Sequence, residues 1–420
     1  MAKIESFSGI HYNPDIVEDV SKVICPPYDI ITPSEQEDFY QKNPYNVIRL
    51  ILGKDLQGDT EKDNKYTRAA GYMDDWLRRN VLMQDSEPGI YFYEQVFSVE
   101  GKQARRWGMI ALMRLDEEGK EKTVYPHEHT HTAPKEDRLK LIKSVEANLS
   151  PVFTIFSDPE DQARGIFEAA RRAVALFDVV DNAGIENRIW RVTDKAVIDK
   201  VKALFSHKEL FIADGHHRYE VAKSFRDYKR QSDQAHFKDS YNYIMTFFTP
   251  LEDEGLCILP THRLLKDVHF NPDQFSACFA VKEMPSCAAL VSEMRDREKD
   301  AGVFGLYKEK KFYLLKLDDK RECNRFIQEG PKEYRNLDVV ILHKVIFDHF
   351  LKIQLSQINY EVDLGRAAAA VDRGDFGALF LLNPTKVDQI RAIALGGEVM
   401  PQKSTYFYPK LSSGLLFHRF

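Results

Sequence analysis

The sequence has few cysteines and no long apolar run, and both absences narrow the kind of protein it encodes. Its five cysteines stand at positions 25, 257, 278, 287 and 323. They form no Cys-x-x-Cys pair and leave one over, so they indicate neither a disulfide framework nor a thiolate zinc site, and we expect reduced packing residues. No stretch approaches the ~20 apolar residues that span a bilayer, and the N-terminus lacks a signal-like segment. A cytoplasmic protein is expected.

Basic residues are outnumbered by acidic residues. The chain carries 59 Lys and Arg against 65 Asp and Glu, a formal net charge of −6. This balance argues against broad binding to nucleic acid or to acidic membranes. Hydrophobic residues make up 43% and charged residues 30%, which is a globular profile. We see no repeats, low-complexity tracts or heptads, and the sequence leaves the oligomeric state open.

At 420 residues the chain exceeds one ordinary core, and its patterns predict a multi-domain α+β protein. Expected helices cover 66–80, 364–372 and 385–395, with a further helix after Pro134. Expected strands cover 89–97, 106–114, 241–249, 256–263, 377–382 and 414–420. The strands at 241–249 and 256–263 are expected to be neighbours joined by the acidic turn 252–255. We predict an N-terminal domain at 1–120, a catalytic core at 121–264 and a C-terminal domain at 265–420.

The most informative stretch is 211–220, Phe-Ile-Ala-Asp-Gly-His-His-Arg-Tyr-Glu, where a short apolar strand enters a glycine-hinged turn and then a helix. Gly215 permits a tight turn, and the free N–H groups of the following helix favour an anion. Asp214, His216, His217 and Arg218 place an acid, two imidazoles and a guanidinium around that point, which suits a phosphate. The alternative is an ordinary helix start with solvated polar residues.

Three further polar clusters stand out. They are His127-Glu128-His129-Thr130-His131, Thr261-His262-Arg263, and the run from Met400 to Lys410. The Lys403-Ser404-Thr405 part of that run follows Gly396-Gly397 and is similar to a phosphate-binding Lys-Ser/Thr element, although its spacing is not that of a P-loop. Its aromatic residues at 406–408 are more typical of packing than of base stacking.

The alternating histidines at 127, 129 and 131 offer a second interpretation. Two of them on one face of a strand, completed by Asp214 or His216, would suit a zinc or hard-cation site. Against this, polar histidines are common in loops, and no helical His-x-x-x-His pair is present.

Several motifs, in the order in which they occur along the chain, resemble those of a known family. Pro126-His-Glu, Asp214-Gly-His-His-Arg, Arg373-Gly-Asp-Phe-Gly-Ala-Leu-Phe, Pro384-Thr-Lys and Gly397-Glu-Val-Met-Pro-Gln-Lys-Ser-Thr are similar to those of free-serine kinases in the ParB/sulfiredoxin-like superfamily. Nearly the whole chain also resembles the DUF1015 family. The first ~120 residues have no counterpart in the short kinases, and the first two motifs are spaced more widely here. The resemblance implies a ParB/sulfiredoxin-like α+β core that carries the strand-Asp-Gly-His-His-Arg-helix motif.

The resemblance also implies roles for individual residues. Glu128, preceded by His127, matches the catalytic carboxylate that takes the proton of a serine hydroxyl, and Asp214 matches an acid that holds the metal or orients the hydroxyl. The nucleotide and phosphate groups would be held by Gly215, His216, His217, Arg218, Lys403, Ser404 and Thr405. In the resemblance, the C-terminal domain closes over the nucleotide.

The expected function is therefore a kinase that phosphorylates free L-serine or a similar amino-acid alcohol, with Mg²⁺ and with ATP or ADP as donor. Such transfer depends on positioning and charge neutralisation, which a helix N-terminus, an arginine and a lysine supply. Two alternatives stay open. One is a metal-dependent phosphatase or hydrolase that uses the histidine loop, and the other is a ParB-like nucleotide-binding switch.

Overall fold

The computed structural model describes residues 2–128, 132–232, 234–266, 268–318 and 325–420. The chain divides into two units, each described here by itself. Unit 1 contains Met1–Tyr125, Thr130–Cys257 and Pro409–Phe420, and unit 2 contains Pro126–His129 and Ile258–Tyr408. The predicted multi-domain α+β class is confirmed. The three domain boundaries predicted from the sequence stay a prediction.

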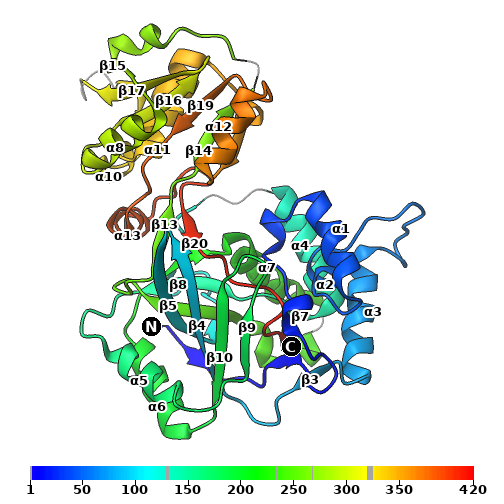
Figure 1. The fold of residues 1–420 in the computed structure, drawn as a ribbon. Coiled ribbons are helices and arrows are strands. Elements are labelled where there is room, and N and C mark those ends of the chain that lie inside the picture. Colours follow the sequence, from blue (N-terminus) through cyan, green and yellow to red (C-terminus); the bar gives the residue numbers. More distant parts are fainter. Residues whose placement is uncertain (1, 129–131, 233, 267, 319–324) are drawn as a thin grey trace. The chain divides into compact units, whose positions relative to one another are not determined.

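Unit 1 is built on a nine-stranded sheet with the order β6-β11-β8-β12-β5-β4-β10-β9, in which β1 pairs with β5 at the side (Figure 1). Its strands are β1 Ile4–Glu5, β4 Ile90–Val99, β5 Lys102–Arg114, β6 Val124–Tyr125, β8 Val152–Phe156, β9 Phe177–Val180, β10 Glu186–Val192, β11 Leu210–Asp214 and β12 Tyr243–Pro250. Two small antiparallel ribbons are added by β2 Ile10–Tyr12 with β3 Leu82–Gln84, and by β7 Ala147–Asn148 with β21 His418–Arg419.

The strands β4 and β5, both predicted from the sequence, form a long hairpin in the middle of this sheet. Its connection is two residues long, Glu100 and Gly101, because Val99 pairs with Lys102. Both connecting residues have positive φ, 51° and 77°, which a type I′ turn requires. The turn fixes the register, so the apolar residues of both strands are buried.

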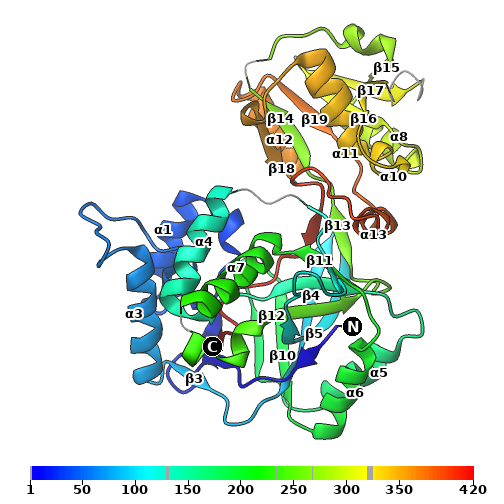
Figure 2. The same ribbon diagram turned by 180° about the vertical axis from the view of Figure 1, so that it is seen from behind.

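Seven α-helices belong to the described part of unit 1. They are α1 Pro33–Lys42, α2 Ile48–Ile51, α3 Lys65–Arg78, α4 Thr132–Val145, α5 Gln162–Ala170, α6 Lys195–Phe205 and α7 His216–Ser232. Figures 1 and 2 show α5 and α6 together on one side of the sheet and α1 to α4 grouped on the other. Phe167 of α5 and Phe205 of α6 are fully buried in the sheet's core, and Leu141 and Val145 of α4 join a second core with α3.

Unit 2 is built on a six-stranded antiparallel sheet with the order β15-β17-β16-β19-β14-β18. Its strands are β14 His262–Leu265, β15 Phe279–Met284, β16 Val303–Lys308, β17 Lys311–Leu317, β18 Ile358–Glu361 and β19 Ala378–Leu381. Its helices are α8 Cys287–Asp296, α10 Lys332–Arg335, α11 Asp338–Ile341, α12 Leu364–Asp372 and α13 Val387–Leu395, and a π-helical stretch covers Leu342–Leu351. A separate pair is formed by β13 Cys257–Leu259 and β20 Tyr406–Tyr408.

One strand prediction is wrong. The segments 241–249 and 256–263 are not neighbours, because β12 pairs with β5 and β8 whereas β14 pairs with β18 and β19. The second segment is also divided at Pro260, which has no N–H group to donate to a strand ladder. The predicted terminal strand at 414–420 is reduced to β21.

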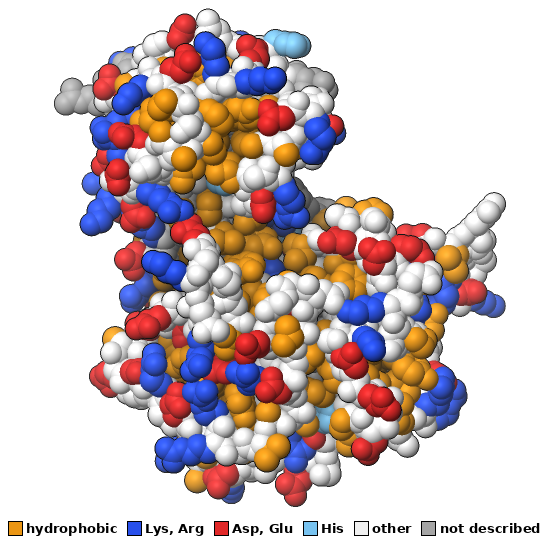
Figure 3. All heavy atoms as spheres, in the orientation of Figure 1, with side chains coloured by type: hydrophobic (Ala, Val, Ile, Leu, Met, Phe, Trp, Pro, Cys, Tyr) orange, Lys and Arg blue, Asp and Glu red, His pale blue; other side chains and the backbone are white. Residues whose placement is uncertain are grey.

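The surface carries both signs of charge. Figure 3 shows acidic and basic side chains interspersed on the drawn face of each unit. None of the helices in the described ranges is both long and apolar enough to cross a membrane. The four cysteines within those ranges are all free thiols, Cys25, Cys257, Cys278 and Cys287.

Two glycines test how tightly the unit 1 sheet is packed. A Cβ atom on Gly108, in the middle of β5, would lie 2.2 Å from the carbonyl oxygen of Phe248 on the neighbouring strand β12, whereas a Cβ atom on Gly71 in α3 would meet nothing within 4 Å. Gly108→Ala is expected to destabilise the protein by about 1–3 kcal/mol through overpacking. Gly71→Ala should stabilise it by about 0.5–1 kcal/mol, because alanine favours a helix interior.

Thermal unfolding midpoints of the two variants and of the parent protein measure this difference. A Gly108→Ala protein as stable as the parent would show that β12 does not lie against β5 at this point.

Candidate functional site

The turn that follows β11 has the conformation that its sequence predicted. Gly215 has φ +90°, and α7 begins at the next residue. The N–H group of Tyr219 donates to the carbonyl oxygen of Gly215 at 3.0 Å, which closes the first turn of the helix. A Cβ atom on Gly215 would lie 2.8 Å from Nε of Arg218. Both the left-handed backbone and the guanidinium beside it therefore require glycine here.

Asp214 is held between two cations. Nη2 of Arg218 donates to Oδ2 of Asp214 at 2.5 Å, and Nζ of Lys410 donates to Oδ1. Arg218 also donates through Nη1 to the carbonyl oxygen of Pro151. The two cations and one carboxylate leave one net positive charge beside the N-terminus of α7, which itself favours anions.

Lys410 reaches Asp214 because two residues of the β4–β5 hairpin fix the backbone around it. Arg106 donates through Nη2 to the carbonyl oxygen of Pro409 at 2.6 Å, and Nε2 of Gln95 donates to that of Lys410 at 3.3 Å. Arg106 is fully buried, and burial lowers its pKa to about 10. Its guanidinium lies 4.8 Å from the ring centre of Phe153.

Sequence reasoning assigned no role to Lys410 or Arg106. For Arg106, the available signal was a charged residue at the start of a continuous apolar strand. Lys410 ends the polar run that begins at Met400, but its partner lies 196 positions away and no short pattern indicates it.

A cavity of about 70 Å³ borders Arg218 within unit 1. Tyr28, Asn148, Ser150 and two arginines supply its polar groups, and Ile51, Leu141, Ile142, Ala147, Leu149, Val221 and Ile244 supply its apolar walls. The second arginine, Arg138 of α4, lies 4.2 Å from the ring centre of Tyr28. Burial raises the pKa of Tyr28, and the charge of the Arg138 guanidinium opposes this effect. The cavity thus joins two guanidinium groups to an apolar wall.

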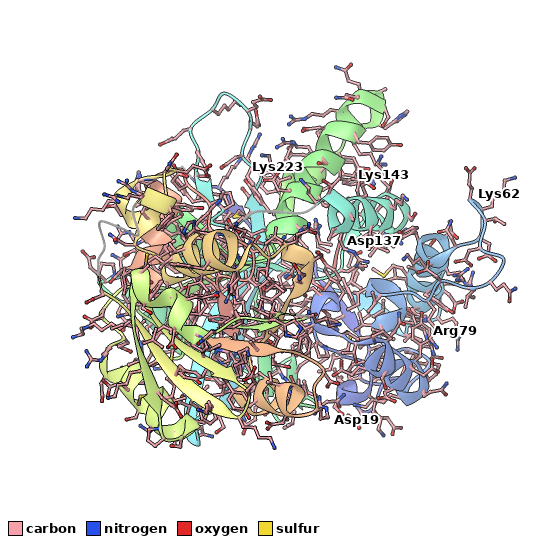
Figure 4. All side chains as sticks on the ribbon, turned by 90° about the horizontal axis from the view of Figure 1, so that it is seen from above. Asp19, Lys62, Arg79, Asp137, Lys143 and Lys223 are labelled. Carbon is pink, nitrogen blue, oxygen red and sulfur yellow. The ribbon has the colours of Figure 1, made fainter. Side chains whose placement is uncertain are left out.

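Helices α4 and α7 carry both arginines, and they lie side by side in Figures 1 and 2. Figure 4 labels Asp137 and Lys143 on α4 and Lys223 on α7. Of the two histidines in the α7 turn, His216 is buried at 7% exposure and His217 is half-buried. Their predicted contacts to phosphate stay a prediction.

In unit 2 the structure brings Glu128 and Lys403 together. The N–H group of Lys403 donates to Oε1 of Glu128 at 2.5 Å. The backbone of Glu128 forms a parallel bridge with Met400, whose N–H group donates to the carbonyl oxygen of His127 at 2.7 Å. The sequence predicted a role for both segments, and their backbones pair directly.

The loop 400–405 is held at nearly every residue. Lys403 has φ +55°, a left-handed conformation that is uncommon for a residue with a side chain. Its carbonyl oxygen accepts a hydrogen bond from Nη2 of the buried Arg263 at 3.1 Å. Strained backbone of this kind is concentrated at functional sites, where the surrounding bonds impose it.

The two hydroxyl residues of the loop are buried and bond within unit 2. Oγ of Ser404 donates to the carbonyl oxygen of Pro401 at 2.5 Å, and Oγ1 of Thr405 lies 3.1 Å from Nε2 of His127. Oγ1 of Thr385 donates to the carbonyl oxygen of Ser404 at 2.7 Å. These bonds stabilise the loop, and the predicted contacts of Lys403, Ser404 and Thr405 with phosphate stay a prediction.

The described residues do not fit a resident metal ion. Within the described ranges, no group of three or more His, Cys, Asp or Glu side chains is placed to hold one. Both carboxylate oxygens of Asp214 already accept bonds from cations. Of the histidine loop, His129 and His131 lie outside the described residues, and His127 is buried against Thr405. The metal interpretations of Asp214 and of this loop stay predictions.

The predicted site residues therefore form two sets. Unit 1 holds Asp214, Gly215, His216, His217 and Arg218, to which the structure adds Lys410, Arg106 and Arg138. Unit 2 holds His127, Glu128, Lys403, Ser404 and Thr405, to which it adds Arg263.

Comparison with known proteins identifies the family. The family model described as "Protein of unknown function (DUF1015)" matches residues 4–340, so the chain belongs to this family. No curated protein matches the sequence.

Three solved structures are similar to this chain over most of their own length. A free serine kinase in complex with AMP is 13% identical, covers 70% of this chain and 89% of its own, and has a TM-score of 0.35. A conserved hypothetical protein from Pyrococcus furiosus is 16% identical, with 70% and 92% covered and a TM-score of 0.34. SbnI with a C-terminal truncation from Staphylococcus aureus is 11% identical, with 72% and 84% covered and a TM-score of 0.34.

The buried histidines of unit 2 predict a pH dependence. Burial, reinforced by Arg263, lowers the pKa of His262 to about 4, and Nδ1 of His262 accepts from the N–H group of Leu382 at 3.4 Å. The folded pKa is below the unfolded value of about 6.5, so the unfolded chain binds more protons between these two values. The stability contributed by neutral His262 is complete above pH 6.5 and is lost as the pH falls towards 4.

We expect the thermal unfolding midpoint of the parent protein to decrease as the pH is lowered from 7 to 4.5. The fall should be smaller in His262→Asn, whose amide oxygen can accept the bond from Leu382 without titrating. An identical fall in both proteins would contradict the burial of neutral His262.

Proposed function

We propose that this member of the DUF1015 family is a nucleotide-dependent kinase that transfers a phosphoryl group to the hydroxyl of free L-serine or a similar amino-acid alcohol. The observation that carries the proposal is the glycine turn at the start of α7, with Arg218 and Lys410 beside it. The donor is ATP or ADP.

The turn supports phosphate binding for two physical reasons. The first N–H groups of α7 have no partners within the helix, and the helix dipole adds partial positive charge at that end. Arg218 presents a planar fork that matches phosphate oxygens, and Lys410 adds a point charge. The cavity that Arg218 borders combines apolar walls with a few polar groups.

Glu128 is the proposed general base. Its carboxylate would take the proton of the acceptor hydroxyl as the oxygen attacks the terminal phosphorus and the bond to the nucleotide breaks. The hydrogen bond from Lys403 N–H orients the carboxylate through one of its oxygens. Such assistance is worth about 10²–10⁴-fold in rate.

The sheet of unit 1 gives the proposal topological support. β6 and β11 are parallel neighbours, with Tyr125 paired to Phe211. The chain continues from β6 into Pro126-His127-Glu128 and from β11 into Gly215. Within unit 1, the Asp214–Arg218 motif thus follows the carboxyl end of a strand that has a parallel neighbour, where open α/β sheets commonly place ligand-binding residues.

In this proposal Mg²⁺ arrives bound to the nucleotide phosphates as part of the substrate, because the cation usually keeps several waters and few protein ligands. The predicted contacts of His216, His217, Lys403, Ser404 and Thr405 with the nucleotide belong to the same proposal.

The role of Glu128 can be tested by replacing its carboxylate with an amide. Glu128→Gln should lower phosphoserine formation from ATP or ADP and L-serine by at least about 10²-fold, because the amide cannot take the hydroxyl proton. Nucleotide affinity should stay within about twofold. Mass spectrometry of the product and calorimetry of nucleotide binding measure the two effects, with Glu398→Gln in the same unit as the matched control.

Unchanged turnover in Glu128→Gln would sink the general-base assignment. Release of phosphate by the parent protein without any phosphorylated acceptor would favour the hydrolase alternative instead.

The role of Arg218 can be tested by removing its guanidinium. Arg218→Ala should weaken nucleotide binding by about tenfold or more, since a hydrogen bond to a charged group is worth about 1.5–3 kcal/mol. Asp214 keeps its bond to Lys410 in this variant, so the fold should persist. Lys223→Ala, farther along α7, is the control and should bind nucleotide like the parent.

Calorimetry without acceptor checks this. Equal affinity in Arg218→Ala and in the parent would count against the phosphate-binding turn.

A further inference from the structure

A small cavity in unit 2 is lined by the buried cation Arg263 and by the carboxylate of Asp338. The cavity measures about 20 Å³, and its polar lining includes Thr261, Arg263, Asn383, Thr385, Gln389 and Ser404. Arg263 is 1% exposed, and among the described residues it forms no ion pair. The sequence singled out Thr261-His262-Arg263 as a polar cluster, and the proposed kinase chemistry gives that cluster no role.

The hydrogen bonds of Arg263 to the described residues leave one of its three nitrogen atoms without a partner. Its Nη1 donates to the carbonyl oxygen of Thr261 and its Nη2 to that of Lys403, while Nε has no hydrogen-bond partner in the described part of the chain. Oγ1 of Thr261 is likewise buried without a partner there. The ring centre of Tyr360 lies 5.4 Å from the guanidinium. Burial lowers the pKa of Arg263 to about 10, although the charge of Glu128 and the hydroxyl of Tyr360 act in the opposite direction. Burying the guanidinium therefore keeps a net cost, which a bound anion would offset.

We propose that this cavity binds the carboxylate of a small amino-acid-like ligand, held by the guanidinium of Arg263 and the hydroxyl of Thr261. This rests on the proposed function only for the identity of the ligand as the acceptor. Recognition of a carboxylate is a separate property that can be measured without nucleotide.

Size and charge favour a carboxylate over a phosphate. A cavity needs about 10–15 Å³ to hold one water, so 20 Å³ admits a group of nearly that size, such as the end of a carboxylate, and not a tetrahedral phosphate. Asp338 also lines the cavity, and its Oδ1 accepts from the N–H group of Gly302 at 2.7 Å. The Asp338 carboxylate repels a doubly charged phosphate more strongly than a singly charged ligand carboxylate.

The bonds of Lys403 relate the cavity to Glu128 within the same unit. The carbonyl oxygen of Lys403 accepts from Arg263, and its N–H group donates to Glu128. The backbone of one residue therefore separates the guanidinium from the carboxylate. L-serine carries a carboxylate at one end and a side-chain hydroxyl at the other.

The test uses the full-length protein without nucleotide and titrates L-serine, glycine, ethanolamine and inorganic phosphate by calorimetry. L-serine and glycine should bind saturably, whereas ethanolamine, which lacks a carboxylate, and phosphate should not. Thr261→Val keeps the side-chain volume and should weaken L-serine binding by about tenfold, because it removes a hydrogen bond to a charged group. Arg263→Lys keeps the charge but loses the planar fork and should weaken it further.

Arg366→Gln, an exposed arginine of unit 2 at 74% side-chain exposure, is the matched control and should bind L-serine like the parent. Equal affinity in Thr261→Val and the parent, binding of ethanolamine, or saturable binding of phosphate would each overturn the proposal. So would the absence of any saturable binding, which would mean that the cavity holds water only.

Failure of the two proposals is distinguishable. L-serine binding that depends on Thr261, without formation of phosphoserine, supports the carboxylate site and overturns the kinase. Phosphoserine formation that is unaffected by Thr261→Val, with no change in the KM for L-serine, does the reverse.

Discussion

The arrangement of the polar residues in unit 1 depends on the carboxylate of Asp214, which bonds cations from two distant parts of the chain. One cation is four residues ahead on α7, and the other comes from the last twelve residues. A carboxylate at this position also lies next to a helix N-terminus, where negative charge is favourable. The buried Arg106 and Gln95 then fix the backbone of the C-terminal segment. The start of α7 and the C-terminal segment are joined through this one acid.

Unit 2 depends on a different constraint, the left-handed backbone of Lys403. A non-glycine residue in this conformation costs of order 1–3 kcal/mol, and it persists only where surrounding bonds impose it. Here the bonds come from Glu128 on one side and Arg263 on the other. The part that Lys403 plays in unit 2 therefore depends on its backbone conformation as well as on the charge of its side chain. The constraint also explains why the hydroxyls of Ser404 and Thr405 are turned inward, since the bonds that hold the loop use them.

Local patterns predicted the local structure well. The strand, the glycine and the helix start at 210–216 follow from an apolar run, a residue free to adopt positive φ, and a helical periodicity, all of which act within a few positions. The helix Leu364–Asp372 was predicted with the bounds that it has. Pairings over long distances were harder, because nothing in a short window records a partner. Thus β14 was assigned to the wrong neighbour, and Lys410 was assigned none.

The double pairing of Asp214 has a consequence for any anion that binds at the α7 turn. Arg218 and Lys410 are already neutralised in part, so an incoming phosphate competes with Asp214 for their N–H donors and gains only the difference. In return, the carboxylate holds both cations in place before the ligand arrives, which reduces the conformational entropy lost on binding. The net positive charge of the three groups still favours the anion. Such a site binds phosphate less tightly but is preorganised for it. This suits a phosphate group that must be bound before transfer and released after it.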